Sequence, residues 1–318
     1  MTDAVLLLTD ARTDRHHAPG HVERPDRRAA VAAGVRDAAL DRLETRTAAP
    51  VEAELVTEVH DPDYLSALGR IEENGGAWLD PDTYLVQGSG EAARLAAGAT
   101  VEAALAALDG RAAVAFAVVR PPGHHASRAG GSGFCLLNNV AIAVAALRRA
   151  GRRRVAIVDW DAHHGDGTQA IFDPDPDLCY ASTHQSPLYP GTGDPADRGI
   201  GIAAGTKHNR SLAPGSGDDH FVAAWRDELL PIVEAFEPEA IVVSAGYDAH
   251  RADPLAHLLV TEHGYREVAR LLGALGARLG LGGIALTLEG GYDLDALRAS
   301  AAATVAGLLA GRAESEVA

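Results

Sequence analysis

Three carboxylates and two imidazoles follow one apolar segment of the chain, within residues 155–167 (VAIVDWDAHHGDG). Asp159, Asp161 and His163 are spaced by two, so in an extended backbone their side chains point to the same side. Three polar side chains at the end of a buried strand are costly without a partner, and a metal ion is one such partner. The alternative is that they cap the next helix and hydrogen-bond among themselves, although a single Asp or Asn is enough for a cap.

A second apolar segment, residues 240–245, is followed closely by Asp248. Taken alone, Asp248 fits a turn as well as a metal site. Together with Asp161 and His163 it makes two carboxylates and one imidazole, and three protein ligands plus an open water position are typical of a catalytic divalent metal. Such a donor set accepts Zn2+ or Fe2+, depending on availability. We therefore predict one metal site formed by these three residues.

Two adjacent histidines, His124 and His125, lie in a segment rich in proline and glycine, residues 120–126 (RPPGHHA). Their positions also fit further metal ligands or plain surface residues. We predict a general base and a general acid, because metal-assisted amide hydrolysis needs one group near neutral pKa to take a proton from water and another to protonate the amine. Asp159 and Asp166 are then expected to orient the two rings by accepting their Nδ1–H bonds.

The last polar element, Leu288–Tyr292 (LEGGY), follows the final apolar segment of the chain. Its glycines let the backbone turn back toward the other motifs, and the Tyr292 hydroxyl is able to donate to a developing oxyanion. A Gly-Gly-Tyr turn is also common as plain structure. The assignment of Tyr292 therefore depends on the other motifs.

These residues need a scaffold, and the apolar segments supply one. Segments with helical spacing and capping residues alternate with short apolar runs, which predicts an α/β fold with a mostly parallel sheet and helices on both faces. Ligands of such folds bind at the carboxyl ends of the strands. No repeat, linker or charge block divides the chain, so we expect one domain over residues 1–318. The predicted strands are 4–9, 112–119, 154–159, 177–183, 240–245 and 283–290, and the predicted helices follow Ser89 up to Gly110, run from Asn138 to Gly151, and cover 218–236 and 295–311.

Composition excludes several classes of partner. The formal net charge of −16 argues against nucleic acid, because a phosphate-binding surface needs a clustered cationic excess. The N-terminal residues lack the basic region of a signal peptide, and no continuous apolar run approaches the roughly 18 residues of a membrane span. Cys135 and Cys179 form no CxxC motif and are interpreted as reduced core residues. We expect a soluble, cytoplasmic protein with no membrane or nucleic-acid partner and an open oligomeric state.

Together, these motifs resemble the histone deacetylase superfamily, in the subgroup of class II deacetylases, bacterial histone-deacetylase-like amidohydrolases and acetylpolyamine amidohydrolases. The resemblance is specific because its blocks match in chain order across most of the sequence. It implies an arginase-like α/β domain around an eight-stranded parallel sheet. The matching blocks are RPPGHHA (120–126), GFCLLNNVAIA (133–143), VDWDAHHGDGTQAIF (158–172), YPGTGD (189–194), VSAGYDAHRADPLA (243–256) and LEGGYD (288–293).

The resemblance also implies roles for the site residues. It places one Zn2+ on the three residues already singled out as metal ligands. It makes His124 the general base, His125 a general acid or electrostatic partner, and Tyr292 the donor that polarises the substrate carbonyl. Related arginases bind two metal ions through carboxylates where this chain has Gly165 and His250. One metal ion is therefore expected here.

Members of the superfamily bind a structural K+ near the zinc. The resemblance assigns this ion to the backbone oxygens of Asp159, Asp161 and His163 and to the hydroxyl of Ser182. We therefore expect K+ as a second, structural cofactor.

Other matching positions concern the substrate. Phe134 and Tyr189 match the walls of an acyl-lysine tunnel, and Gly133 matches the glycine beside that wall. Asp82, in the variable segment DPDTY, resembles the rim carboxylate that holds the substrate backbone. Leu255 stands where some acetylpolyamine-selective relatives carry a glutamate. Because Leu255 has no charge to attract a polyamine nitrogen, an acyl-lysine or a neutral substrate is favoured.

The resulting prediction is a zinc-dependent amidohydrolase that removes acetyl or other acyl groups from N-acetyl-lysine in proteins or peptides. Two alternatives stay open: a deacetylase of acetylpolyamines or other small acetylated amines, and a catalytically silent protein that binds acyl-lysine. The intact set of His124, His125 and Tyr292 argues against the silent protein. The rim segments 10–28 and 75–88 carry no readable code for the substrate.

Overall fold

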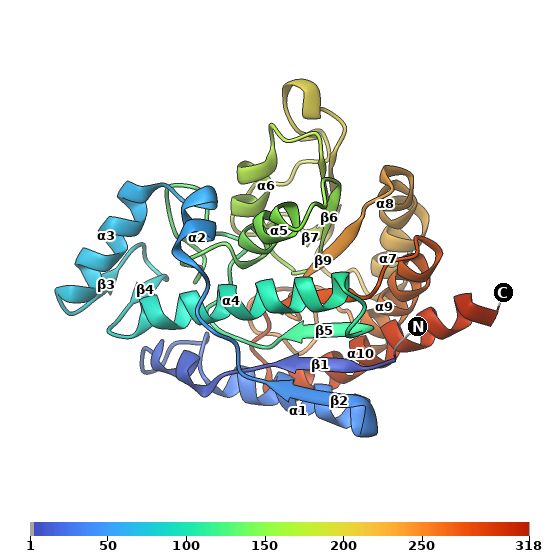
Figure 1. Ribbon diagram of the computed structural model, residues 1–318, viewed down its shortest axis with the longest axis horizontal. Coiled ribbons are helices and arrows are strands. Elements are labelled where there is room, and N and C mark those ends of the chain that lie inside the picture. The colour runs from blue at the N-terminus through green and yellow to red at the C-terminus, as the bar shows by residue number, and fades with distance from the viewer. Residues whose placement is uncertain (1–2, 318) are drawn as a thin grey trace.

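An eight-stranded parallel sheet forms the centre of the molecule (Figure 1). The computed structural model describes residues 3–317, so Met1, Thr2 and Ala318 of the predicted domain lie outside the described residues. The strand order is β2-β1-β5-β10-β9-β6-β7-β8, and the predicted α/β fold is confirmed. The strands are β1 (Val5–Leu8), β2 (Leu43–Arg46), β5 (Val114–Ala117), β6 (Val155–Asp159), β7 (Leu178–Gln185), β8 (Lys207–Leu212), β9 (Ala240–Ala245) and β10 (Ile284–Leu288).

β2 and β8 are the two strands of this sheet that a search for apolar runs does not predict. They are the outermost strands. β2 (LETR) is exposed along most of its length, and β8 (KHNRSL) mixes buried and open positions. Edge strands carry polar and charged residues because they are covered less completely than central strands and must not pair with other chains. Their sequences therefore lack the apolar signature of the six inner strands.

Helices cover both faces of the sheet (Figure 1). A small antiparallel hairpin of β3 (Ala77–Trp78) and β4 (Tyr84–Leu85) stands apart from the main sheet. The helices are α1 (Asp26–Ala39), α2 (Ala53–Val59), α3 (Pro62–Glu73), α4 (Ser89–Leu108), α5 (Asn139–Arg149), α6 (Asp166–Phe172), α7 (Asp218–Ala223), α8 (Leu230–Phe236), α9 (Glu262–Arg278) and α10 (Leu294–Val317), with a π-helical segment, Ala224–Leu229, between α7 and α8.

Two helix starts test the capping interpretation. Asn138 caps α5 as expected, since its side chain accepts a hydrogen bond from Ala141 N at 3.0 Å. The interpretation of Ser89 as the residue before α4 is wrong: Gly88, at φ +94°, takes the cap position and Ser89 is the first helical residue. The Ser89 hydroxyl instead lies 2.8 Å from Nδ1 of the buried His16. The hydroxyl also accepts from the Val86 amide at 2.9 Å, so one local and one tertiary contact hold it in place of the expected cap.

The sheet separates two hydrophobic cores. Successive side chains of a strand point to opposite faces, so Val5 and Leu7 of β1 enter one core, whereas Leu6 and Leu8 enter the other. The first core is completed by α1, α7, α8, α9 and α10, and the second by α2, α4 and α5. Because both faces are covered, the inner strands read as continuous apolar runs.

Both cysteines are buried and unpaired, which confirms that Cys135 and Cys179 are reduced core residues. The segment Leu294–Ser315 of α10 meets the length and composition criterion of a membrane span, which the search for continuous apolar runs misses. Half of its apolar window is buried, because α10 packs along α9 and α1. Core helices of soluble proteins meet the same criterion, so the finding is weak support for a membrane span.

Candidate active site

The candidate site lies where four adjacent strands in the middle of the sheet end. These strands are β5, β10, β9 and β6, and each sequence motif follows one of them. Parallel strands share their carboxyl edge, so motifs that are far apart along the chain meet there. The site is therefore assembled by the sheet order and not by any one segment.

Asp161, His163 and Asp248 form a compact buried cluster. Their ligand atoms all lie within 4.8 Å of one another. His163 Nδ1 is 2.8 Å from Asp248 Oδ2 and 3.2 Å from Asp161 Oδ1. The Gly290 amide donates to Asp161 Oδ2 and the Ala162 amide donates to Asp248 Oδ1, each at 2.7 Å. The structure thus brings together the three residues that the sequence names as metal ligands.

This cluster concentrates ionisable groups in the protein interior. Burial and the charge of Asp161 raise the pKa of Asp248 to about 6. Burial lowers the pKa of His163, but the charges of Asp248 and Asp161 outweigh it and raise that pKa to about 10. Two carboxylates this close together are stabilised by a positive charge, which either a protonated His163 or a bound cation supplies.

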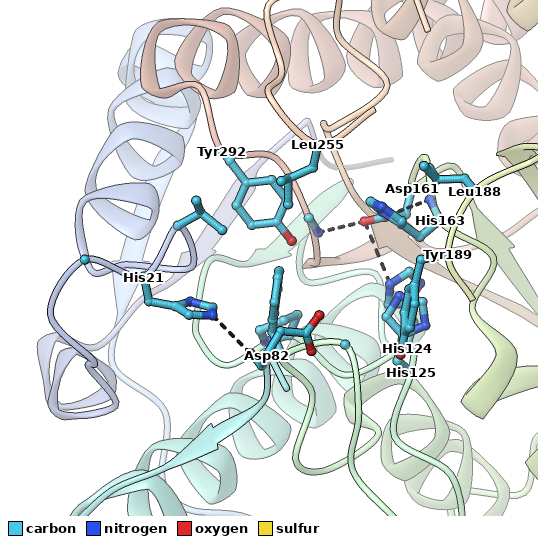
Figure 2. Close-up of a pocket in the computed structure, with 16 residues that line it drawn as sticks. His21, Asp82, His124, His125, Asp161, His163, Leu188, Tyr189, Leu255 and Tyr292 are labelled. Atoms are coloured by element: carbon cyan, nitrogen blue, oxygen red, sulfur yellow. Dashed lines mark hydrogen bonds and ion pairs between the residues drawn. The ribbon is translucent and has the colours of Figure 1, made fainter. Parts of the chain in front are cut away.

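His124 and His125 lie beside this cluster (Figure 2). His124 Nδ1 is 3.1 Å from Asp159 Oδ2, and His125 Nδ1 is 2.7 Å from Asp166 Oδ1. His124 Nε2 faces the cluster, 3.9 Å from Asp161 Oδ2. Both histidines therefore have the carboxylate partners that the sequence analysis predicts for them. Neither belongs to the cluster of Asp161, His163 and Asp248.

The pKa values of the two histidines are shifted in opposite directions. Burial lowers the pKa of His124, but the charges of Asp161 and Asp159 outweigh it and hold the pKa well above its usual value. Burial and the charge of His124 lower the pKa of His125 to about 4, because Asp166 offsets them only in part. Neighbouring groups whose pKa values are driven apart are typical of acid–base sites.

Tyr292 lies across the cavity from the histidines, with its hydroxyl turned into the cavity (Figure 2). Its ring packs edge-on against Phe134 at 5.8 Å between centroids, and the guanidinium of Arg27 lies 4.7 Å from the ring centre. The Tyr292 amide donates to Asp253 Oδ2 at 2.7 Å. Burial holds the pKa of Tyr292 well above its usual value, so the hydroxyl keeps its proton at neutral pH.

These groups open into a cavity of about 440 Å3. All five residues that the sequence assigns to the substrate line it. They are Asp82, Gly133, Phe134, Tyr189 and Leu255.

Gly133 and Phe134 have backbone conformations that few residues adopt. Their φ angles are +52° and +70°, in the left-handed region that is strained for a side chain as large as Phe. A Cβ at Gly133 would collide with the His125 ring. Phe134 is held in part by its amide, which donates to the Thr83 hydroxyl at 3.0 Å. The cavity wall is thus built close against a histidine of the site.

The residues assigned to potassium lie next to one another, at the end of β6 and within β7. Ser182 of β7 is the register partner of Asp159 of β6, and Asp161 and His163 follow Asp159 directly. Ser182 is fully buried and its hydroxyl lies 3.0 Å from His184 Nδ1.

Gly165 and His250 are the two positions at which the sequence analysis expects no ligands for a second metal ion. A Cβ at Gly165 would collide with the Asp159 carboxylate and the Tyr180 hydroxyl, so no carboxylate fits there. His250 lies 3.4 Å from Glu262 Oε2, and its Nδ1 accepts from the Ala252 amide. Neither position offers a carboxylate to a second metal ion.

Glu289 is a buried site residue to which the sequence analysis assigned no role. Its Oε2 accepts from the Gly123 amide at 2.6 Å and from the His124 amide at 3.1 Å, and its Oε1 accepts from the Ser244 hydroxyl at 3.2 Å. The side chain is 0% exposed, and burial raises its pKa to about 7. A carboxylate directly after an apolar strand is a signal that it has a buried partner.

A second buried group to which the sequence analysis assigned no role supports the turn that carries Tyr292. Arg27 donates to the carbonyl oxygens of Gly291 and Glu289, and Glu23 bridges it to Arg120. Both arginines and Glu23 are 0% exposed. The spacing of Glu23 and Arg27 by four residues hints at their ion pair, but no local pattern shows that Arg27 reaches the Tyr292 turn.

Known proteins match this chain over most of its length. The histone deacetylase domain family matches residues 21–308, which include every site residue described above. The chain belongs to this family. A solved structure, the crystal structure of the HDA15 HD domain, is 37% identical, covers 97% of this chain and 89% of its own, and superposes with a TM-score of 0.90.

Curated relatives in the family carry related names. A probable deacetylase of Archaeoglobus fulgidus is 39% identical, over 91% of this chain and 81% of the relative. A histone deacetylase-like amidohydrolase of Pseudomonas aeruginosa is 37% identical, over 87% of this chain and 73% of the relative. The human polyamine deacetylase HDAC10 is 36% identical, and the match covers 97% of this chain but only 47% of that longer protein.

Proposed function

We propose that this member of the histone deacetylase family is a zinc-dependent amidohydrolase that removes the acetyl group from N-acetyl-lysine, or another acyl group from an acylated lysine, in peptides or proteins. Hydrolysis releases acetate, or the corresponding carboxylate, and a free amine. The observation that carries the proposal is the buried cluster of Asp161, His163 and Asp248 in the wall of a cavity that also holds two histidines and Tyr292.

The three clustered side chains suit a single Zn2+. Zinc takes imidazole nitrogen and carboxylate oxygen as ligands, and three protein ligands leave a position for water or substrate. The excess of negative charge among these buried groups favours a bound cation. When bound, zinc supplies a Lewis acid for the amide carbonyl and for water. Fe2+ suits the same donor set, so metal analysis is needed to identify the ion.

His124 acts as the general base in this proposal. Asp159 holds Nδ1, so Nε2 faces the metal ligands and is free to accept a proton from the attacking water. The charge of Asp161 is the largest influence that raises the pKa of His124. A cation on Asp161 offsets that charge and lowers the pKa of His124 toward the range of a base that works at neutral pH.

Tyr292 donates its hydroxyl proton to the carbonyl oxygen as that oxygen becomes negative. His125, held by Asp166 at Nδ1, keeps its two predicted roles, general acid or electrostatic partner. His124 then passes the proton that it took from water to the leaving amine. Phe134 and Tyr189 line the cavity that holds the acyl chain and the lysine methylenes.

The pairing of Ser182 with Asp159 supports a structural K+ at the position assigned by the resemblance. These residues would hold the ion, whose charge would stabilise the loop that carries Asp161 and His163.

Acetylpolyamines are the competing substrates. The human relative named a polyamine deacetylase supports this class. Leu255 argues against a binding site for the polyamine at that position, because it lines the cavity without a charge. Three residues argue against the silent acyl-lysine-binding protein: His124 and His125 each lie in hydrogen-bond contact with a carboxylate, and the Tyr292 hydroxyl is turned into the cavity.

The test is a hydrolysis screen with acetyl-lysine peptides and small acetylated amines, run on metal-depleted protein before and after Zn2+ is added. We expect acetate release from an acetyl-lysine peptide that depends on the metal. Faster turnover of acetylspermidine would favour the polyamine alternative. If no acylated amine is hydrolysed in a chelator-sensitive way, the enzyme proposal is wrong and the silent binding protein is favoured.

A further inference from the structure

The mouth of the cavity is built from two segments that are far apart in the sequence. One contains His21, and the other is the β3-β4 hairpin with the loop between its strands. His21 Nε2 lies 3.0 Å from the Asp82 carbonyl oxygen (Figure 2). The His21 ring also packs edge-on against Phe134, with 4.8 Å between centroids. His21 therefore links the hairpin to the cavity wall.

Trp78 of this hairpin is an exposed aromatic side chain one ring away from the cavity lining. Its ring centroid lies 6.0 Å from that of His21 and 5.8 Å from that of the buried Tyr84. The side chain is nevertheless 57% exposed. A single exposed hydrophobic residue is ordinary on a protein surface. Trp78 differs because its ring contacts His21, which lines the cavity.

Two carboxylates lie in the loop between β3 and β4, and one of them lines the cavity. Asp80 is fixed by the amides of Asp82 and Thr83, which donate to its Oδ1 at 3.0 and 2.6 Å. The Asp82 carboxylate lines the cavity and turns into its mouth (Figure 2). Burial and the nearby Asp80 raise the pKa of Asp82. This part of the rim therefore presents the Asp82 carboxylate to the cavity, with the His21 imidazole beside it.

Lysine and arginine are missing from the described lining of the cavity, and its basic side chains are histidines. Of the sixteen residues that line the cavity in the described part of the chain, none is a lysine or an arginine. Arg27 lies over the Tyr292 ring, but it is buried and paired with Glu23. Arg24 lies outside the lining and pairs with Asp26 at 3.6 Å. The formal net charge of −16 adds a long-range attraction for cations and a repulsion for anions.

We propose that Trp78 and Asp82 form a rim subsite for a positively charged group of the substrate, next to the acylated amine that enters the cavity. The inference rests on the proposed function and narrows its substrate class to acylated amines that carry a second cation, an ammonium or a guanidinium. The indole face supplies a cation–π contact and Asp82 supplies the opposite charge. Basic residues beside an acyl-lysine and the free amines of a polyamine both present this chemistry.

The test uses two pairs of substrates that differ only in the second cation. In one pair, an acetyl-lysine peptide carries either arginine or the uncharged citrulline beside the acetyl-lysine. In the other, acetylspermidine is compared with an N-acetylalkylamine of the same length that has no further amine. We expect a higher kcat/KM for the charged member of at least one pair, with a preference that weakens as salt is added. The pair that shows the larger preference identifies the source of the cation.

The variant Trp78→Leu separates this role from a structural one. We expect it to lower kcat/KM for the charged substrate by about two- to fivefold, the effect of one exposed cation–π contact, and to leave the uncharged partner unchanged. Trp78→Phe should keep part of the preference, and Asp82→Asn should reduce it. The matched control is Ile202→Ala, which removes a hydrophobic side chain that is 86% exposed and outside the cavity lining.

The outcomes separate this inference from the proposed function. If wild-type protein hydrolyses charged and uncharged substrates equally well, the rim subsite is wrong and the amidohydrolase proposal stands. If Trp78→Leu lowers both members of a pair by the same factor, Trp78 acts through the hairpin structure and the inference is overturned. If no acylated amine is hydrolysed at all, the proposed function itself has failed.

Discussion

Glu289→Ala tests the role of the buried carboxylate behind His124. In the native protein Glu289 accepts the amide hydrogens of Gly123 and His124 with one oxygen and the Ser244 hydroxyl with the other. Alanine leaves two buried backbone N–H groups without an acceptor, at about 1–3 kcal/mol each, so we expect a loss of about 2–6 kcal/mol in the free energy of unfolding. A shift of His124 by about 1 Å would also lower kcat by about 100-fold.

Glu289→Gln is the matched control. Its carbonyl oxygen still accepts both amide hydrogens, and its amide nitrogen is able to donate to Ser244. We therefore expect the Gln variant to lie within about 1 kcal/mol of wild type and to keep most of its kcat.

Urea unfolding at constant m-value measures the stability change, and steady-state hydrolysis of the best substrate measures kcat. If Glu289→Ala costs less than about 1 kcal/mol, or if Glu289→Gln is as damaging as Glu289→Ala, the hydrogen-bonding account is wrong.

Two further predictions concern the Tyr292 hydroxyl and the buried Glu23. Tyr292→Phe should lower kcat by about 100- to 1000-fold with little change in unfolding free energy, because only the donor to the oxyanion is lost and the ring still packs on Arg27 and Phe134; full activity would exclude the oxyanion role. Burial raises the pKa of Glu23, but the charge of Arg120 outweighs it and lowers that pKa to about 2. Glu23 thus stabilises the fold above its unfolded pKa, and about 3 kcal/mol is lost as the pH falls from about 4.5 to about 2. Urea unfolding across this pH range should show that Glu23→Gln is less stable at neutral pH and has a flatter acid limb; an unchanged acid limb would contradict the assignment.

The inner part of the sheet could be predicted because burial on both faces leaves a direct trace in the sequence. The strand ending at Asp159 reads as a continuous apolar run, and the polar residues that follow it mark the carboxyl edge. The edge strands β2 and β8 could not be found in this way, because their polar residues face solvent or neighbouring loops.

The reactive residues could be named from the sequence because each stands next to the strand that positions it. Their supporting contacts could not. Arg27 reaches the carbonyl oxygens of Gly291 and Glu289 across most of the chain, and this contact depends on how α1 packs against the sheet. The contact between the Ser89 hydroxyl and His16 also joins two segments that are far apart in the sequence. Long-range packing determines such contacts, and the spacing of residues within one segment does not reveal it.

The central claim is that Asp161, His163 and Asp248 bind one metal ion on which amide hydrolysis depends. Metal content and acetate release, measured on the same samples of wild type and Asp248→Ala, test it most directly. We predict one zinc per wild-type chain, loss of hydrolysis on chelation and recovery on zinc addition, and a folded Asp248→Ala protein with little metal and little activity. Full hydrolysis by metal-free protein, or an Asp248→Ala variant that keeps both metal and activity, would contradict the claim.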